Sequence, residues 1–151
     1  MNPAVVRVPV VRVRQSDIPL PAYMSQGAAG LDLAADVTDD VTFHPGERRL
    51  VPTGIALALP RGYEGQVRPR SGLAHRTGLT VLNAPGTIDS DYRGEIQVLL
   101  VNLGDDIAVV RRGDRIAQLV VAPVVRIEWT EDESLATTTR GGGGFGSTDR
   151  R

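Results

Sequence analysis

The sequence contains no cysteine, and its basic residues include no lysine. Without cysteine, the chain has no disulfide framework, no thiolate ligand for a metal and no thiol nucleophile. All 17 basic residues are arginines, and 18 acidic residues bring the formal net charge to −1. This balance argues against a general nucleic-acid-binding protein, so we predict no stable nucleic-acid binding. It leaves room for a local cluster of arginines around phosphate groups.

Long apolar runs and targeting signals are absent as well. The longest apolar stretches, such as residues 116–125, are too short and too interrupted to span a bilayer. Residues 1–7 contain no basic segment followed by a sustained apolar run, so we see no secretory signal. We therefore expect a cytoplasmic protein with no membrane association. A chain of 151 residues suits one domain with a hydrophobic core of its own.

Most of the chain consists of short apolar segments separated by turn signals. These signals recur without helical periods between them, which favours an all-β sandwich, jelly roll or barrel over a βαβ arrangement. A helical turn is expected only at residues 71–76. Pro9 indicates that the first strand lies at a sheet edge or contains a bulge. We predict strands at residues 5–14, 31–33, 41–43, 50–59, 63–67, 79–82, 96–101, 107–110, 116–121 and 124–129.

Residues 83–95 are predicted to form a long hairpin loop, because apolar runs at residues 79–82 and 96–101 flank them. Within this loop, Asp89 directly follows Ile88. A β-branched side chain favours extended backbone, so we expect the Asp89 carboxylate to stand at the end of a strand.

Two further side chains accompany Asp89 in this loop. Asn83 supplies an amide before it, and Tyr92 supplies an aromatic ring three residues after it. An amide, a carboxylate and a ring on one rigid hairpin suit the recognition of a small planar ligand beside a general base. For any one of these residues alone, the simpler interpretation is a surface turn that carries a polar or aromatic side chain.

Two other polar segments interrupt the apolar pattern. Arg70 and Ser71 lie at the start of the expected helical turn, where free N–H groups favour an anion. The alternative is an ordinary N-cap at Ser71 with a solvated Arg70. Gln118 lies among apolar neighbours. A buried amide needs partners, so Gln118 is either a structural residue or a ligand contact, and both interpretations stay open.

The composition changes near Glu131, after which the chain is polar and then rich in glycine. We divide the sequence into a domain at residues 1–136 and an arm at residues 137–151. Ordering so many glycines costs much backbone entropy, so we expect the arm to be flexible when no ligand is bound. Arg140, the backbone N–H groups and Phe145 are suited to closing over a phosphorylated base. A disordered tail without function is the alternative.

Five segments resemble, in order and spacing, the motifs of the trimeric dUTP diphosphatases (dUTPases). The resemblance covers nearly the whole chain, with small departures at Leu31, where the family often has an aromatic residue, and at Asp149, where glycine is common. It implies an all-β, distorted jelly-roll (β-sandwich) subunit and a homotrimer with three sites at subunit interfaces. The segments are Ala29-Gly30-Leu31-Asp32-Leu33 and residues 69–74, 86–95, 113–119 and 140–148.

The same resemblance implies hydrolysis of dUTP to dUMP and diphosphate with Mg²⁺, which supplies dUMP for thymidylate synthesis and keeps uracil out of DNA. It makes Asp89 the base that deprotonates the attacking water. Tyr92 is expected under the deoxyribose, and Asp32 is expected to contact the metal through water. The residues it places around the substrate are Arg70, Ser71, Gly72, Asn83, Thr87, Ile88, Tyr92, Gln97, Gln118, Arg140, Gly144, Phe145, Gly146 and Ser147.

Two alternative functions are compatible with the same fold. A dCTP deaminase resembles this fold but has a catalytic glutamate ten residues after the hairpin aspartate, where this chain has Leu99. An apolar side chain cannot carry protons, which argues against deamination. A non-catalytic nucleotide-binding regulatory module would be favoured by loss of Asp89, Gln118 or the arm. All three are present.

Overall fold

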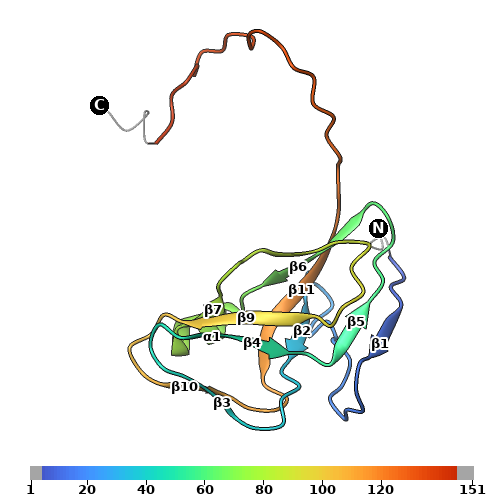
Figure 1. Cartoon of the computed structure of the whole chain (residues 1–151), viewed down its shortest axis with the longest axis vertical. Helices are drawn as coiled ribbons and strands as arrows, with labels where there is room; N and C mark the ends of the chain where they lie inside the picture. The colour runs from blue at the N-terminus through green and yellow to red at the C-terminus, as the bar shows by residue number, and fades with distance from the viewer. Residues whose placement is uncertain (1–4, 146–151) are drawn as a thin grey trace.

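The computed structural model describes residues 5–145, which form eleven strands and one short helix (Figure 1). The prediction of an all-β fold is confirmed. No helix in this part of the chain has the length and apolar character needed to cross a membrane. In chain order the elements are β1 (Val10–Arg12), β2 (Leu31–Ala34), β3 (Val41–Phe43), β4 (Arg48–Pro52), β5 (Ile55–Leu57), β6 (Tyr63–Arg68), α1 (Ser71–Thr77), β7 (Leu79–Val81), β8 (Gly86–Ile88), β9 (Gln97–Asn102), β10 (Ala108–Val110) and β11 (Arg115–Pro123).

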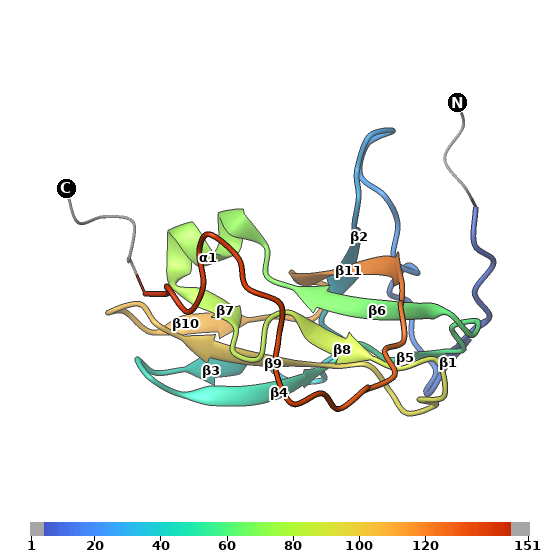
Figure 2. The same cartoon turned by 90° about the horizontal axis from the view of Figure 1, so that it is seen from above.

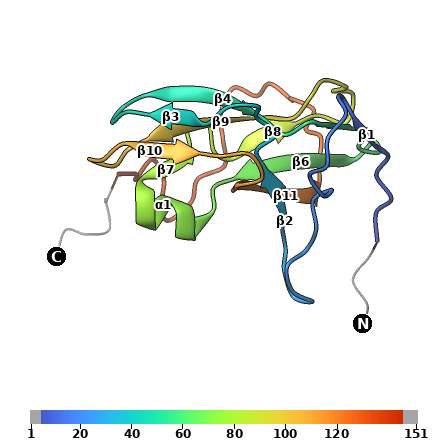
Figure 3. The ribbon, with the colours of Figure 1, turned by 90° about the horizontal axis from the view of Figure 1, so that it is seen from below.

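The strands pair antiparallel in a distorted jelly roll. A four-stranded sheet has the order β2-β11-β6-β8, and a three-stranded sheet has the order β4-β9-β7. Two smaller sheets pair β1 with β5 and β10 with β3. Views from above and from below show β6 and β11 on one side of the molecule and β3, β4 and β9 on the other (Figure 2, Figure 3).

The hydrophobic core lies between these layers. Leu33 and Leu119 come from the four-stranded sheet, Val51 and Leu100 from the three-stranded sheet, and Phe43 from β3. All five side chains are buried. Burial of one such side chain stabilises the fold by roughly 1.5–3 kcal/mol, so together the five side chains stabilise the packing of the two layers.

The central hairpin is confirmed, because β7 pairs with β9. Its loop holds a feature that the sequence did not reveal, namely strand β8, which leaves this hairpin and pairs with β6 in the four-stranded sheet. The loop therefore connects both sheets. Since Ile88 ends β8, Asp89 stands at the end of a strand, as expected.

Two predicted strands are wrong in detail. Residues 50–59 were expected to form one strand, yet Thr53 and Gly54 divide them into β4 and β5, which belong to different sheets. Gly54 has a φ of +75°, which turns the chain sharply. Residues 124–129 form no strand. Beyond Pro123, the side chains of Val125 and Trp129 are 89% and 87% exposed, because no strand of the described chain pairs with this segment.

The turn at Gly54 gives a stability prediction. A Cβ atom at Gly54 would lie 2.2 Å from Oδ2 of the buried Asp36, in addition to the unfavourable positive φ. We expect Gly54→Ala to lower the free energy of unfolding by at least about 3 kcal/mol. The matched control is Gly62→Ala, where φ is +85° but no atom lies within 4 Å.

The control variant should lose only about 1–2 kcal/mol, the cost of the backbone conformation itself. Urea denaturation at one fixed protein concentration measures both values. Equal losses at Gly54 and Gly62 would show that the contact with Asp36 contributes nothing.

Candidate functional site

A cavity of about 420 Å³ opens beside β8, β9 and the turn that follows β8. It brings together six residues that the resemblance placed around the substrate, namely Asn83, Thr87, Ile88, Asp89, Tyr92 and Gln97. Six more lining residues were not predicted: Leu50, Val67, Gly86, Glu95, Ile96 and Leu99. The lining therefore combines apolar walls with a few polar groups, as small-molecule sites commonly do.

The Asp89 carboxylate is exposed at the entrance to this cavity. Its backbone is fixed on both sides, since Ile88 pairs with Gly65 of β6 and the N–H of Tyr92 donates to the Asp89 carbonyl over 3.1 Å. A fixed backbone with a free carboxylate suits a group that must meet water and ligand in a defined direction.

Tyr92 is held by a hydrogen bond within the same turn. Its hydroxyl donates to the backbone carbonyl of Glu95 over 3.0 Å. A Cβ atom at Gly94 would lie 2.3 Å from this hydroxyl, so glycine there lets the phenol lie against the backbone. Because the hydroxyl is engaged, the ring of Tyr92, 46% exposed, is the part that can meet a ligand.

Backbone groups of β8 also face the cavity. β8 is the last strand of the four-stranded sheet, so its outer edge has N–H and C=O groups available for a ligand. The side-chain amide of Asn83 lies close to the start of this strand, because a Cβ atom at Gly86 would be 3.3 Å from Asn83 Nδ2. A planar ring with alternating donors and acceptors fits such an edge.

A second cluster of predicted residues surrounds Asp32 on β2. Its Oδ1 accepts a hydrogen bond from Gln118 Nε2 over 3.1 Å and pairs with Arg70 Nε at 3.5 Å. Its Oδ2 accepts from Arg115 Nη1 over 3.0 Å. Two guanidinium groups around one carboxylate leave a net positive charge, which suits phosphate. Arg115 was not predicted, because its contact depends on the pairing of β11 with β2.

The start of helix α1 adjoins this cluster. The suggestion that Ser71 is the N-cap is wrong, since the helix begins at Ser71 and Arg70 occupies the cap position. The alternative of a solvated Arg70 is also wrong, because its side chain is 24% exposed and pairs with Asp32. Ser71 and Gly72 are the first helical residues, and the first turn of a helix leaves backbone N–H groups without helical partners.

Within one chain, the Asp32 cluster and the cavity do not share a lining. On β6, Val67 lines the cavity and pairs with Gly86, and the next residue, Arg68, pairs with Gln118. The cavity and the Asp32 cluster therefore have different linings at neighbouring positions along β6.

The C-terminal arm lies away from both groups (Figure 1). Arg140 Nε donates to the carbonyl of Gly143 over 2.9 Å, which is a contact within the arm. Gly144 and Phe145 are exposed. Gly146 and Ser147, which were also expected at the substrate, lie outside the described residues.

Comparison with known proteins adds the family. The dUTPase family model matches residues 16–149. The chain belongs to the dUTPase family. It is 62% identical over 148 residues to the deoxyuridine 5'-triphosphate nucleotidohydrolase of Anaeromyxobacter sp. (strain Fw109-5), covering 98% of this chain and 99% of that protein. It is 61% identical to the protein of the same name from Methylocella silvestris, over 88% of this chain and 84% of that protein.

Solved dUTPase structures share the fold. A mutant dUTPase of Staphylococcus phage 80α superposes with a TM-score of 0.83 at 25% identity, covering 93% of this chain and 98% of that one. Another mutant of that phage enzyme, solved with dUpNHpp, gives 0.81 at 24% identity over 95% and 99%. A mutant dUTPase of S. aureus phage φ11, described with a structural Mg(II) ion, gives 0.77 at 22% identity over 87% and 100%.

Leu99, the position at which a deaminase was expected to have a glutamate, lines the same cavity as Asp89. The wall there is apolar and offers no group that transfers protons.

The groups that contact Asp32 limit how this dUTPase could bind a metal ion. Both carboxylate oxygens already have N–H partners. Among residues 5–145, no group of three or more His, Cys, Asp or Glu side chains is arranged to hold a metal ion. These residues do not fit a site built from protein ligands alone. A Mg²⁺ ion held by substrate phosphates and water would not need such a group of protein ligands.

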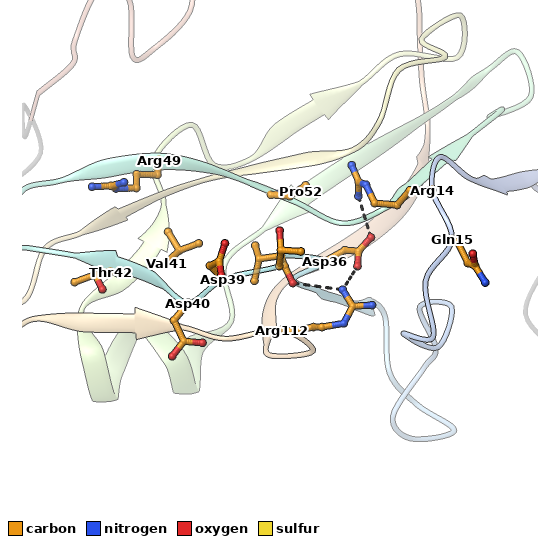
Figure 4. Close-up of a pocket in the computed structure, with 12 residues that line it drawn as sticks. Arg14, Gln15, Asp36, Asp39, Asp40, Val41, Thr42, Arg49, Pro52 and Arg112 are labelled. Atoms are coloured by element: carbon orange, nitrogen blue, oxygen red, sulfur yellow. Dashed lines mark hydrogen bonds and ion pairs between the residues drawn. The ribbon is translucent and has the colours of Figure 1, made fainter.

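A larger cavity, of about 790 Å³, lies elsewhere and contains none of the predicted site residues. Asp36 stands in it between Arg14 and Arg112 (Figure 4). The Asp36 side chain is 1% exposed, and Ser16 also donates to it over 3.1 Å. Burial raises the pKa of Asp36, but the hydrogen bonds from Arg14, Arg112 and Ser16 outweigh burial and lower it overall.

Proposed function

We propose that this chain hydrolyses dUTP to dUMP and diphosphate in sites shared between the subunits of a homotrimer. The observation that carries the proposal is the cavity in which Asp89, Asn83 and Tyr92 meet at the open edge of β8. The 62% identity to a deoxyuridine 5'-triphosphate nucleotidohydrolase over nearly the whole chain supports the choice of substrate. The product dUMP is a precursor for thymidylate, and removing dUTP keeps uracil out of DNA. We place this activity in the cytoplasm.

Uracil is recognised by the polar groups at the cavity edge. The Asn83 amide and the backbone of Thr87 and Ile88 offer both donors and acceptors to the edge of the ring. Ile88 and Leu99 supply apolar walls. We expect the hairpin to exclude thymine through its methyl group. Tyr92 lies beneath the deoxyribose, where its ring would meet a 2′-hydroxyl.

Asp89 acts as the general base. It accepts a proton from water as the water oxygen bonds to the α-phosphorus. The bond from this phosphorus to the bridging oxygen breaks, and diphosphate leaves with the bonding electrons. No covalent intermediate is required. Negative charge grows on the leaving group, so guanidinium groups near it stabilise the transition state more than the bound substrate.

The phosphates are bound by the Asp32 cluster of another subunit. Arg70, Ser71, Gly72 and Gln118 contribute the charge, hydroxyl, backbone N–H and amide that bind them. Within one chain this cluster does not line the cavity, so we place it at the cavity of a neighbouring subunit. Mg²⁺ bound to these phosphates would neutralise charge on the diphosphate. Residues of the arm complete the enclosure.

A sharp test is incubation with each deoxynucleoside triphosphate and Mg²⁺, followed by separation of the products. The proposal expects diphosphate and a monophosphate from dUTP, with little turnover of the other substrates. Release of ammonia from dCTP would instead show a deaminase. A protein that binds dUTP and leaves it intact would point to a regulatory module.

Tyr92 gives a prediction about sugar selectivity. Tyr92→Ala removes the ring that would meet a ribose 2′-hydroxyl, so UTP should become a relatively better substrate. We expect the ratio of kcat/KM for dUTP over UTP to fall about tenfold or more, comparable with a contact of about 1.4 kcal/mol. Tyr63→Ala is the matched control, because Tyr63 lies on β6 outside the cavity lining. An unchanged ratio in Tyr92→Ala would rule out this steric role.

A further inference from the structure

The turn that carries Asp89 and Tyr92 is connected to the rest of the chain through the carboxylate of Glu95. Glu95 Oε1 accepts a hydrogen bond from the backbone N–H of Gly54 over 2.8 Å. Glu95 Oε2 accepts one from Arg14 Nη2 over 2.7 Å. Both oxygens are therefore engaged, and the side chain is only 16% exposed. This is the geometry of a fixed anchor rather than of a solvated surface acid.

Arg14 is itself held on its other side. Its Nη1 donates to Oδ2 of Asp36 over 2.9 Å (Figure 4). The hydrogen bond to Glu95, together with that to Asp36, raises the pKa of Arg14 above its usual value. Asp36 is buried and keeps its charge, because its pKa is lowered overall. Arg14 thus bridges a fixed internal carboxylate and the end of the turn at residues 89–95.

From Glu95 the contacts continue into the site. The Glu95 carbonyl accepts the Tyr92 hydroxyl over 3.0 Å, and the Tyr92 N–H donates to the Asp89 carbonyl over 3.1 Å. On the other side, the N–H of Ile96 donates to the carbonyl of Ile55 over 2.9 Å. These bonds link Glu95 to Tyr92 and Asp89, while β8 is held separately by its pairing with β6.

We propose that Glu95, held by Arg14, is a positioning residue that sets the direction of the Asp89 carboxylate and the Tyr92 ring. This inference rests on the proposed hydrolysis of dUTP. Glu95 lines the cavity, but both its carboxylate oxygens are engaged by Arg14 and Gly54, so in this scheme it binds neither the base nor the phosphates. It acts through the turn, where a displacement of about 1 Å can cost up to about 10²-fold in rate.

Glu95→Gln tests the ion pair with Arg14 separately from the hydrogen bond with the Gly54 N–H. The glutamine oxygen can still accept the Gly54 N–H, while its NH₂ group faces the Arg14 guanidinium and cannot pair with it. We expect kcat for dUTP to fall about 10-fold to 100-fold. The KM should change by less than about threefold, because Asn83 and β8 bind the base independently of Glu95. The preference for dUTP over UTP should also decrease as Tyr92 loosens.

Arg112→Gln is the matched control. Arg112 pairs with the same Asp36 carboxylate as Arg14 does, but its partners do not include Glu95. It should lower thermal stability while leaving kcat and the dUTP preference unchanged. Arg14→Gln should repeat the kinetic effects of Glu95→Gln, and Arg14→Lys should restore part of kcat because it keeps a charge near Glu95. Equal kinetic losses in Arg112→Gln and Glu95→Gln would overturn the proposal.

Amide hydrogen exchange of the substrate-free protein makes the test independent of the reaction. In Glu95→Gln, exchange at the amides of Tyr92 and Ile96 should accelerate relative to the parent and to Arg112→Gln. A parent protein without activity on dUTP would refute the proposed function, while this exchange pattern would still establish the anchor. Unchanged exchange in Glu95→Gln, or normal kcat in an active enzyme, would refute the positioning role.

Discussion

Replacing Asp89 with asparagine is expected to leave the fold and nucleotide binding intact while lowering turnover of dUTP by about 10²–10⁴-fold. The substitution keeps the size of the side chain and most of its hydrogen bonding, but it removes the basicity. The carboxylate is exposed and stands at the end of β8, where the backbone is held by pairing with β6 rather than by this side chain. The loss should therefore appear in kcat.

The measurement combines steady-state kinetics with calorimetric binding of a non-hydrolysable dUTP analogue. Asp91→Asn is the matched control, because Asp91 is exposed in the same turn and does not line the cavity. The control should retain parental turnover. Near-normal turnover in Asp89→Asn would show that another group activates the water.

Deletion of residues 137–151 is expected to reduce dUTP turnover strongly, by about 10²-fold, and to change dUMP affinity little. The last strand, β11, ends at Pro123, and Arg140 bonds only to Gly143 among its described partners. The fold and the oligomer should therefore survive the deletion. Closure of the arm would exclude water and bring Arg140 to the γ-phosphate, and the entropy lost by the glycines is offset only when a triphosphate is present.

Fluorescence gives an independent measurement of arm closure. Phe145→Trp in a Trp129→Phe background leaves one tryptophan in the chain, since Trp129 is the only natural one. Its emission should change with a non-hydrolysable dUTP analogue and hardly change with dUMP. Full activity after the deletion would make the arm a solvated tail.

Local patterns predicted most of the strands because each depends on a few neighbouring residues. The strand at residues 41–43 and the helix that begins at Ser71 follow directly from apolar patterns and turn signals. The position of Asp89 after a β-branched residue at a strand end was predictable for the same reason. The break at Gly54 was not, because apolar residues flank Pro52, Thr53 and Gly54 on both sides and the change of sheet between β4 and β5 depends on distant strands. The apolar residues at positions 124–129 likewise led to the prediction of a strand that the structure does not contain.

Contacts between distant residues account for what the sequence could not reveal about the site. Arg14 and Glu95 are 81 positions apart, and Arg115 and Asp32 are 83 apart. Nothing in the sequence around any of these four residues indicates its partner. The resemblance to dUTPases supplied Gln118 and Arg70 through their motifs, but Glu95 received no role there. Its importance becomes visible only from the hydrogen bonds of its two carboxylate oxygens.

The separation of the Asp32 cluster from the cavity has a consequence for a newly made chain. If each site joins the cavity of one subunit to the cluster of another, a lone chain holds every catalytic group and still cannot catalyse. Activity per chain then depends on the cellular concentration of its copies, and it appears only as they meet. Synthesis raises the concentration of the chain and growth dilutes it. Through assembly, both would then determine how fast the cell can remove dUTP.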